Sequence, residues 1–333
     1  MNAQVGVWQG IMETARWAPT PHNTQAYRLE VVSDGVAHIY ADNRCLTPAT
    51  DPDGQFLYVG LGVFVEIMRL CAADKGLELK FDQGAARFKP GLKYLGVLTL
   101  CESSVTPDVD PRLILQRRTS RLPFDGVPVT AHAKDYLREE AQRYGQDLGF
   151  SDDPADIAAV LRFNTKILLY DIMHTGLRRD LTTWIRWTNK EYAEKKDGFS
   201  IPSLNQNGPF MWVFLRSYWL LRLPLARIWV QRKYERGITN VSTIGWLKGP
   251  FKTPSEWIRT GELLARLWLK ATEHRLYVHP FGSVITNHAA RQWALQQLNL
   301  TEGPGEMCWL LFRIGTGPEP ARSLRHNTDD YFL

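Results

Sequence analysis

The chain has 333 residues, of which 44% are hydrophobic and 23% are charged, and its formal net charge is +5. This length allows one large domain or two of ordinary size, and the composition is that of a globular protein with a substantial core. The mild positive charge suits an anionic ligand or surface. Because there is no Lys/Arg-rich tail and no short nucleic-acid-binding signature, we expect no nucleic-acid partner.

The four cysteines are scattered and form no CxxC pair. This pattern argues against a zinc site or a disulfide framework and fits a reducing cytoplasm. His274, His279 and His288 lack metal-ligand spacing, so we expect no metal. Met1 to Ala18 shows no signal-peptide pattern, and no eighteen apolar residues run uninterrupted, so a cytoplasmic location is expected.

Periodicity and turn residues predict the elements of the first third of the chain. A helix is expected over 5–17 and is stopped by Pro19 and Pro21. The loop 18–27 is rich in turn formers and hydrogen-bonding side chains. The elements expected to follow are a hairpin over 29–32 and 37–40, a long apolar helix over 56–75, and a buried central strand over 94–100.

A basic cluster follows the apolar run 113–115. Arg117, Arg118 and Arg121 lie within five residues of one another, with Thr119 and Ser120 between them. Three guanidinium groups this close repel one another unless they spread into solvent or share an anion. Planar guanidinium groups bind phosphate through paired hydrogen bonds. The cluster is therefore either a solvated basic turn or a phosphate site.

The second half of the sequence repeats the first faintly. Gly62 and Gly261 are separated by 199 residues (261−62), as are Leu77 and Leu276. Each copy reads as a long apolar helix, a short strand and later a buried strand, the last one over 308–314. Thr253 opens the second long helix with a capping box. The shared order of elements predicts two related halves.

A segment of about 160–252 has no counterpart in the first half. Within it, residues 209–236 contain seven aromatic and six basic residues against one acid, and Pro224 divides them into two helical pieces. The segment could be a lid over a site, a surface for an anionic membrane, or a helical partner interface. It could also be ordinary helices packed on the core, with arginines extended to solvent.

Two loops carry a resemblance to a known family. The loop 18–27 (APTPHNTQAY) resembles the A-P-S-x-x-N-x-Q-P-W loop of the nitroreductase superfamily, and 117–124 (RRTSRLPF) is similar to its R-R-S-x-R-x-F phosphate loop. In that family the phosphate loop normally comes first, and FMN lies between the two subunits of a domain-swapped dimer. Here the order is reversed, as a fused pair of halves would allow. The chain also looks like the Acg-type subgroup of tandem nitroreductases, which shares the turn 51–54.

Carried over by position, the resemblance implies a set of FMN-binding residues. Those implied to hold the phosphate and ribityl chain are Arg117, Arg118, Thr119 and Arg121. Those implied to line the ribityl and pyrimidine side are Thr20, His22, Asn23 and Gln25. The turn Pro280-Phe281-Gly282 matches the one whose backbone NH faces the flavin N5. Arg325, less closely Arg322, would complete the phosphate site. No catalytic side chain is assigned, because the flavin ring itself carries the hydride.

The expected fold is therefore α+β. It consists of two nitroreductase-like α/β/α halves, 1–105 and 106–333, that form an intrachain pseudo-dimer with a helical, lid-like insertion. One FMN would lie between the halves, because no second phosphate loop precedes Ala18. The expected function is an FMN oxidoreductase that takes hydride from NAD(P)H or an organic substrate. The alternative is a flavin-holding protein with little turnover. We expect a monomer or weak oligomer.

Overall fold

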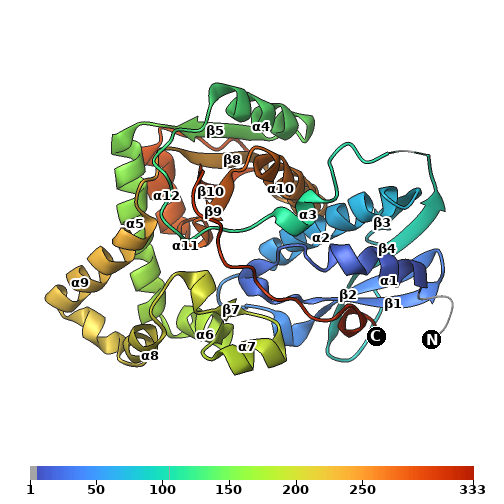
Figure 1. Cartoon of the computed structure of the whole chain (residues 1–333), viewed down its shortest axis with the longest axis horizontal. Coiled ribbons are helices and arrows are strands. Elements are labelled where there is room, and N and C mark those ends of the chain that lie inside the picture. The colour runs from blue at the N-terminus through green and yellow to red at the C-terminus, as the bar shows by residue number, and fades with distance from the viewer. Residues whose placement is uncertain (1–5, 105) are drawn as a thin grey trace.

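The structure is a computed structural model that describes residues 6–104 and 106–333. Val5, in the first expected helix, and the expected boundary at residue 105 lie outside the described residues. Two antiparallel four-stranded sheets flank a pair of long central helices, so the fold is mixed α and β (Figure 1).

The first sheet and its helices come from the N-terminal third of the chain. Their bounds are α1 (Gly6–Ala15), β1 (Tyr27–Ser33), β2 (Val36–Asp42), α2 (Gln55–Ala73), β3 (Leu77–Asp82) and β4 (Leu92–Glu102). The sheet order is β1-β2-β4-β3, which puts β4 in the interior of the sheet as expected. The predicted α1, hairpin and α2 are confirmed, and α1 buries Trp8, Ile11, Met12 and Ala15 at helical spacing.

The second sheet comes from later segments. Their bounds are α4 (Ala131–Arg143), β5 (Asp147–Ser151), β8 (Ile244–Pro250), α10 (Pro254–Glu273), β9 (Tyr277–Pro280) and β10 (Glu306–Gly315). The order is β5-β8-β10-β9. If α1 is matched with α4, β1 with β5, β2 with β8 and so on, the two sheets have the same strand order. The predicted capping box at Thr253 is present.

Two long insertions separate the elements of the second set. The helices between β5 and β8 are α5 (Pro154–Met173), α6 (Thr175–Thr183), α7 (Asn189–Lys195), α8 (Gly208–Arg216) and α9 (Pro224–Glu235), with two short strands β6 (Ile185–Arg186) and β7 (Phe199–Ser200). Two further helices, α11 (Gly282–Thr286) and α12 (His288–Gln297), lie between β9 and β10. The expected insertion reached 252, but β8 already belongs to the second sheet.

The central helices α2 and α10 cross at two glycines. A Cβ built on Gly62 would lie 2.8 Å from the carbonyl carbon of Ile258, and one on Gly261 would lie 2.8 Å from that of Val59. The two partners are themselves 199 residues apart (258−59), as the two glycines are. The crossing is therefore reciprocal, which is the contact pattern of a two-fold interface. Only glycine allows backbones to approach so closely.

A buried ion-pair network also joins the two central helices. Arg266 on α10 binds Glu66 on α2 at 3.0 Å, and it also pairs with Glu140 and Asp108. Arg69 on α2 binds Glu262 on α10 at 2.6 Å. By length and composition, α2 is the one helix among the described residues that could cross a membrane, but 72% of its apolar window is buried. It is a core helix.

The segment that follows the last strand of each sheet crosses to the other sheet. Residues after β4 form the short helix α3 (Leu113–Gln116) and then reach β9, where Thr119 bridges Val278. Residues after β10 return to the first sheet, where Phe332 bridges Leu29 (Figure 1, dark red). These crossings place loop 117–122 and the C-terminal tail on the same side of the central helices as loop 18–27.

Candidate functional site

The loop before β1 has an unusual backbone. His22, Asn23 and Gln25 all have positive φ, at 50°, 55° and 50°. Non-glycine residues adopt this region rarely, and each costs of the order of 1–3 kcal/mol unless the surroundings impose it. Such residues cluster at binding and catalytic sites, so the loop is a candidate site on backbone geometry alone.

Side chains and a distant segment hold this loop in place. The hydroxyl of Thr20 accepts a hydrogen bond from the backbone N–H of Gln25 at 3.0 Å. The Asn23 side chain donates to the carbonyl of Gly198 at 3.0 Å and to that of Leu324 at 3.2 Å. The Gly198 N–H in turn donates to the Asn23 carbonyl at 3.0 Å. The insertion and the C-terminal tail therefore both fix the loop.

Gln25 has a different place from the one expected. It is 1% exposed and is not among the residues that line the cavity described below. Its amide donates to the Lys196 carbonyl at 2.8 Å, and its oxygen accepts from the His326 N–H at 2.8 Å and the Tyr331 hydroxyl at 2.7 Å. Both the side-chain NH2 group and the side-chain oxygen of Gln25 are therefore hydrogen-bonded within the protein. Through these bonds Gln25 anchors the loop to the insertion and to the tail.

A buried arginine on β10 fixes the backbone of the arginine loop, residues 117–122. Arg313 on β10 is 0% exposed and donates to the carbonyls of Ser120 at 3.2 Å and Leu122 at 2.9 Å. Its Nε donates to Nδ1 of His279 at 3.1 Å. Burial, with Arg121 and Arg313 nearby, lowers the pKa of His279 well below its usual value, so this imidazole is neutral and can accept. Arg313 therefore sets the shape of loop 117–122.

Several arginines converge at one end of a cavity. Arg117 is 8% and Arg325 7% exposed, and both line the cavity with Arg118 and Arg322. Burial, and then the charges of Arg325 and Arg118, lower the pKa of Arg117 to about 9. Burial likewise lowers the pKa of Arg325 to about 10. Within the described residues, the ion pair that these four arginines make is Arg118 with Glu319, at 3.9 Å.

This cluster is therefore not a solvated basic turn. Buried guanidinium groups without carboxylate partners are costly, because desolvation and mutual repulsion both oppose their charge. Among the described residues, Nε of Arg118 and Nε of Arg325 are buried without a hydrogen-bond partner. Buried charges are normally paired, but within the described part of the chain Arg117, Arg322 and Arg325 have no carboxylate partner, and the Glu319 partner of Arg118 is 75% exposed. The chemistry of the donors fits an anion of more than one negative charge, such as a phosphate monoester.

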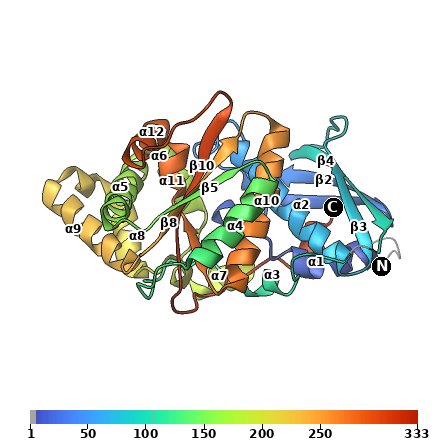
Figure 2. The same ribbon diagram turned by 90° about the horizontal axis from the view of Figure 1, so that it is seen from above.

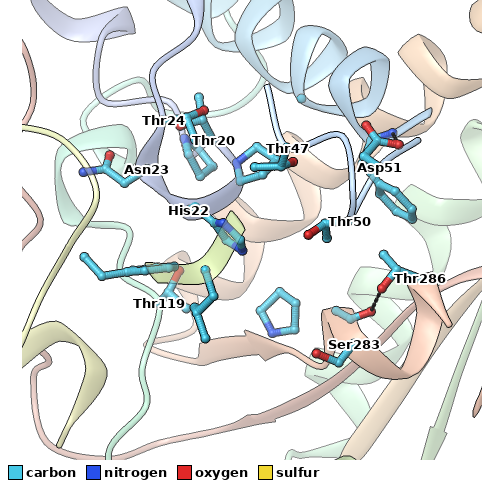
Figure 3. Close-up of a pocket in the computed structure, with 18 of the residues that line it drawn as sticks. Thr20, His22, Asn23, Thr24, Thr47, Thr50, Asp51, Thr119, Ser283 and Thr286 are labelled. Carbon is cyan, nitrogen blue, oxygen red and sulfur yellow. Dashed lines mark hydrogen bonds between the residues drawn. The ribbon is translucent and has the colours of Figure 1, made fainter. Parts of the chain in front are cut away.

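The cavity extends from this cluster to the strained loop. It has a volume of about 700 Å³ and is lined by segments of both sheets and of the insertion. Among the side chains in the described part that face it, Oδ1 of Asn23 and Nδ1 of His22 are also buried without a partner. Burial and Arg121 lower the pKa of His22 to about 4, so it is neutral at pH 7. Figure 3 shows Thr20, His22, Asn23 and Thr119 among the residues that line the cavity.

The turn after β9 forms the opposite wall. Gly282 begins α11, and a Cβ built on it would meet no atom within 4 Å, so its surface faces open space. The Phe281 N–H donates a hydrogen bond to the Leu311 carbonyl at 2.7 Å. Ser283 follows and hydrogen-bonds Asp171, whose pKa is raised by burial to about 6. Ser283 and Thr286 carry hydroxyls on this side (Figure 3).

Arg121 lies apart from the other arginines. Its guanidinium donates to the Ser203 carbonyl at 3.2 Å and lies 4.9 Å from the ring centre of Phe199. Its positive charge opposes the rise that burial causes in the pKa of Tyr234, and it helps to lower the pKa of His22. It lines the same cavity, but on the side of the insertion. The structure thus brings Arg117, Arg118 and Arg325 together and puts Arg121 beside Ser203 and Phe199 of the insertion.

The insertion supplies a large part of the apolar wall. Residues of α5, α8 and α9 line the cavity; the set on α8 is Phe210, Met211, Phe214 and Leu215. The insertion is also tied to the turn between β2 and α2, because the Asp180 carboxylate accepts the N–H groups of Ala49 and Thr50, each at 2.9 Å. The insertion therefore lines one side of the cavity and contacts the N-terminal third of the chain.

Sequence reasoning missed several of these residues. Arg313 was read only as part of a buried strand; a lone arginine amid apolar neighbours was the available signal. Asp171 and Tyr234 lie in helices with no distinguishing motif, so no signal in the sequence marks them. The second arginine of the tail, Arg322, stacks on Trp17 with 3.5 Å between its guanidinium carbon and the ring centre. It joins Arg325 in the cluster rather than replacing it.

Comparison with known proteins finds distant similarity. No family model matches the chain. An uncharacterized protein of Mycobacterium tuberculosis, Rv3127, is 23% identical over 314 residues, which cover 90% of this chain and 84% of that protein. The solved structures that resemble the chain in fold include the following three.

All three structures are described as nitroreductases. The FMN- and NADPH-dependent nitroreductase NfnB of a Sphigopyxis strain is 16% identical, covers 66% of this chain and 95% of its own, and has a TM-score of 0.39. The FMN-dependent NfnB of Mycobacterium smegmatis, in complex with NADPH, is 13% identical with a TM-score of 0.40, over 66% and 94% of the chains. A putative nitroreductase of Anabaena variabilis is 10% identical with a TM-score of 0.45, over 94% of this chain and 73% of its own.

Proposed function

We propose that this protein is an FMN-dependent oxidoreductase of the nitroreductase type, with one flavin bound in the cavity between its two sheets. The observation that carries the proposal is the buried arginine cluster, which lacks sufficient carboxylate partners and opens into a cavity of about 700 Å³. This volume lies within the range of cofactor sites. The paired loops that resemble those of the family border the same cavity.

The residues present fit the parts of FMN. Arg117, Arg118 and Arg325 would hold the phosphate, with the Thr119 hydroxyl beside them. Nη1 of Arg117 already lies 3.4 Å from that hydroxyl. The unpartnered Oδ1 of Asn23 would accept from a polar edge of the ring. Gln25 acts one step away, by fixing the backbone of the loop that carries Asn23.

FMN, when bound, supplies hydride transfer between a reduced donor and an acceptor. The chain's own residues would bind and orient the cofactor and the substrate. The turn at Gly282 offers N–H groups that lack an intrahelical partner, because they belong to the first turn of α11. His22 and His279 are both neutral at pH 7, so neither adds a positive charge to the cavity. We propose NADPH or NADH as donor, by analogy with the NADPH-bound NfnB.

We further propose that the two halves form an intrachain pseudo-dimer. The shared strand order and the reciprocal contact at Gly62 and Gly261 support this. In such an arrangement the first half contributes loop 18–27 and the linker after it contributes loop 117–122. One complete set of loops gives one flavin site.

The insertion supports a second candidate function. Because α5, α8 and α9 form much of the cavity wall, a bound flavin would be shielded on that side. A protein that holds flavin under such a cover with little turnover is the alternative. Access of a nicotinamide to the cavity separates the two functions.

The first experiment is an anaerobic spectrum of the purified protein before and after NADPH or NADH is added. Bleaching of the flavin bands supports the oxidoreductase, and oxidised bands that persist with both donors support the flavin-holding alternative. A protein that neither carries nor takes up FMN would overturn both.

The second experiment tests the arginine cluster. Arg117→Ala should weaken FMN binding by about 1.5–3 kcal/mol, the usual worth of a hydrogen bond to a charged group, which is roughly 10- to 150-fold in Kd. Arg112→Ala is the matched control, because Arg112 lies on the same segment with 86% of its side chain exposed. Equal FMN affinity of the two variants, measured by flavin fluorescence, would contradict the assignment.

A further inference from the structure

The outer faces of α8 and α9 carry the same pattern. On α8, the exposed residues Pro209, Trp212, Val213 and Arg216 follow one another at i, i+3, i+4 and i+7. On α9, the exposed residues Leu225, Ile228, Trp229 and Arg232 do the same. This spacing puts each set on one face of its helix. Both helices therefore present an apolar stripe that ends in an arginine to solvent.

These apolar side chains are largely exposed to solvent. Leu225 is 82%, Trp229 56%, Trp219 55% and Val213 53% exposed. The opposite faces of the same helices are already occupied, since Phe214 on α8 and others line the cavity. The helices thus have two apolar faces, and only the inner one has a partner within the described part of the chain. Contiguous exposed apolar surface of this kind marks an interaction site.

The charge of this surface is strongly one-sided. Residues 209–236 carry six basic side chains and one acidic side chain, a surplus of +5. That equals the formal net charge of the whole chain, whose remaining residues carry 34 of each sign (40−6 and 35−1). Arg216, Arg222, Arg227, Arg232 and Arg236 are all exposed. The acid, Glu235, accepts a hydrogen bond from Gln231 at 2.9 Å.

We propose that the outer face of α8 and α9, with the connecting residues 217–223, docks on an anionic lipid bilayer. Exposed Trp, Leu and Ile would enter the interface between headgroups and acyl chains, and the arginines would contact lipid phosphates. Arg216 already lies over the ring of Trp212 at 4.1 Å, an arrangement that pairs an apolar anchor with a cation. The combination of apolar area and basic charge gives the two binding signals that stable membrane association needs.

A second copy of the chain fits this surface less well. Two faces that each carry a surplus of five positive charges would repel one another, whereas an anionic bilayer complements them. Helices α8 and α9 also project at one end of the long axis, with α9 outermost and with α1 and the C-terminus at the other end (Figure 2). A projecting end can reach a flat surface without a clash from the rest of the molecule. The proposal does not depend on whether flavin binds.

The test is co-sedimentation of the purified full chain with vesicles. We expect the protein to sediment with phosphatidylserine/phosphatidylcholine vesicles and to remain in solution with phosphatidylcholine alone. The triple variant R216Q/R222Q/R232Q should lower the partition coefficient by about a hundredfold, because each basic group near an anionic surface contributes roughly a factor of five. A double variant, L225S/W229S, should also lose binding while retaining every charge.

A matched triple variant gives the control. Lys80→Gln, Arg87→Gln and Lys252→Gln remove the same charge from exposed positions outside this segment, and they should leave binding within about twofold of the unchanged protein. If that control loses as much as R216Q/R222Q/R232Q, net charge alone acts and the proposal fails. Equal binding to both kinds of vesicle, or none to either, also overturns it. So does a concentration-dependent dimer that L225S/W229S abolishes, since the surface would then bind another copy.

Discussion

The crossing of α2 and α10 at Gly62 and Gly261 gives the sharpest test of the architecture. In each helix an alanine would add a methyl group 2.8 Å from a backbone carbonyl carbon of the other helix. Carbon atoms normally pack at about 3.5–4.0 Å. The carbonyl oxygen of the same group lies closer still. The helices would therefore have to separate by at least about 1 Å along their line of contact. Neither obstacle is the flexible end of a side chain, so local rotation cannot relieve it.

The expected cost of each substitution follows from this geometry. Overpacking a core costs about 1–3 kcal/mol and occasionally more, and the ion pairs between Arg266 and Glu66 would also stretch. Alanine would recover about 1 kcal/mol of helix propensity relative to glycine. We expect Gly62→Ala and Gly261→Ala each to lower the free energy of unfolding by about 2–3 kcal/mol. This is a large fraction of the 5–15 kcal/mol typical of a folded protein.

The double variant tests whether the two contacts belong to one reciprocal crossing. Once the helices have separated for one methyl group, most of the space for the second already exists. The double variant should therefore cost less than the sum of the single variants by about 1 kcal/mol or more, as coupled neighbours do. Urea unfolding followed by circular dichroism measures all of these free energies.

The control is a glycine on a helix that makes no close backbone contact. Gly10→Ala lies on α1, where a Cβ would meet only the end of the Lys75 side chain at 3.5 Å. It should be neutral or stabilising by up to about 1 kcal/mol. A neutral result for Gly62→Ala or Gly261→Ala would show that the helices are not in such close contact. Strict additivity in the double variant would show two independent contacts rather than one crossing.

Three further predictions concern buried polar groups. Arg266→Met should cost about 3–5 kcal/mol in chemical unfolding, because it leaves Glu66 and Glu140 buried without their partner; an effect below about 1 kcal/mol would contradict the network. The raised pKa of Asp171, about 6 against 3.8, gives a contribution to stability that is present at pH 4 and lost as pH rises through 6. Asp171→Asn should therefore raise stability by about 1–3 kcal/mol at pH 7.5 but not at pH 4, and equal effects at the two pH values would refute the shift. Gln25→Ala should cost about 2 kcal/mol and speed proteolytic cleavage of the C-terminal tail, while an unchanged cleavage rate would show that the tail is held elsewhere.

The elements with strong local signals were predictable from the sequence. α1 and α10 have apolar residues at helical spacing, and α10 begins at a capping box whose two residues, Thr253 and Glu256, are three positions apart. The repeat at a separation of 199 residues predicts two related halves. The two sheets have the same strand order, and the relation between the halves stays a prediction. Short strands were harder. β5 and β8 are interrupted by glycines and flank a long insertion, so alternation is weak there.

The candidate site was predictable only in part. The arginine and amide loops are each continuous stretches, so a sequence pattern can find them. What Gln25 does could not be predicted, because its partners lie 171 and about 300 residues away. The same applies to Arg313, which contacts loop 117–122 only through the pairing of distant segments. Long-range contacts decide whether a polar side chain faces a cavity or supports the loop beside it.

Joining both central helices in one chain has a consequence for how the cavity forms. When two halves are separate molecules, the space between them exists only at concentrations above their dissociation constant. On one chain the second half is always present at a high effective concentration, of the order of millimolar for short flexible connections. The cavity should therefore persist at any dilution.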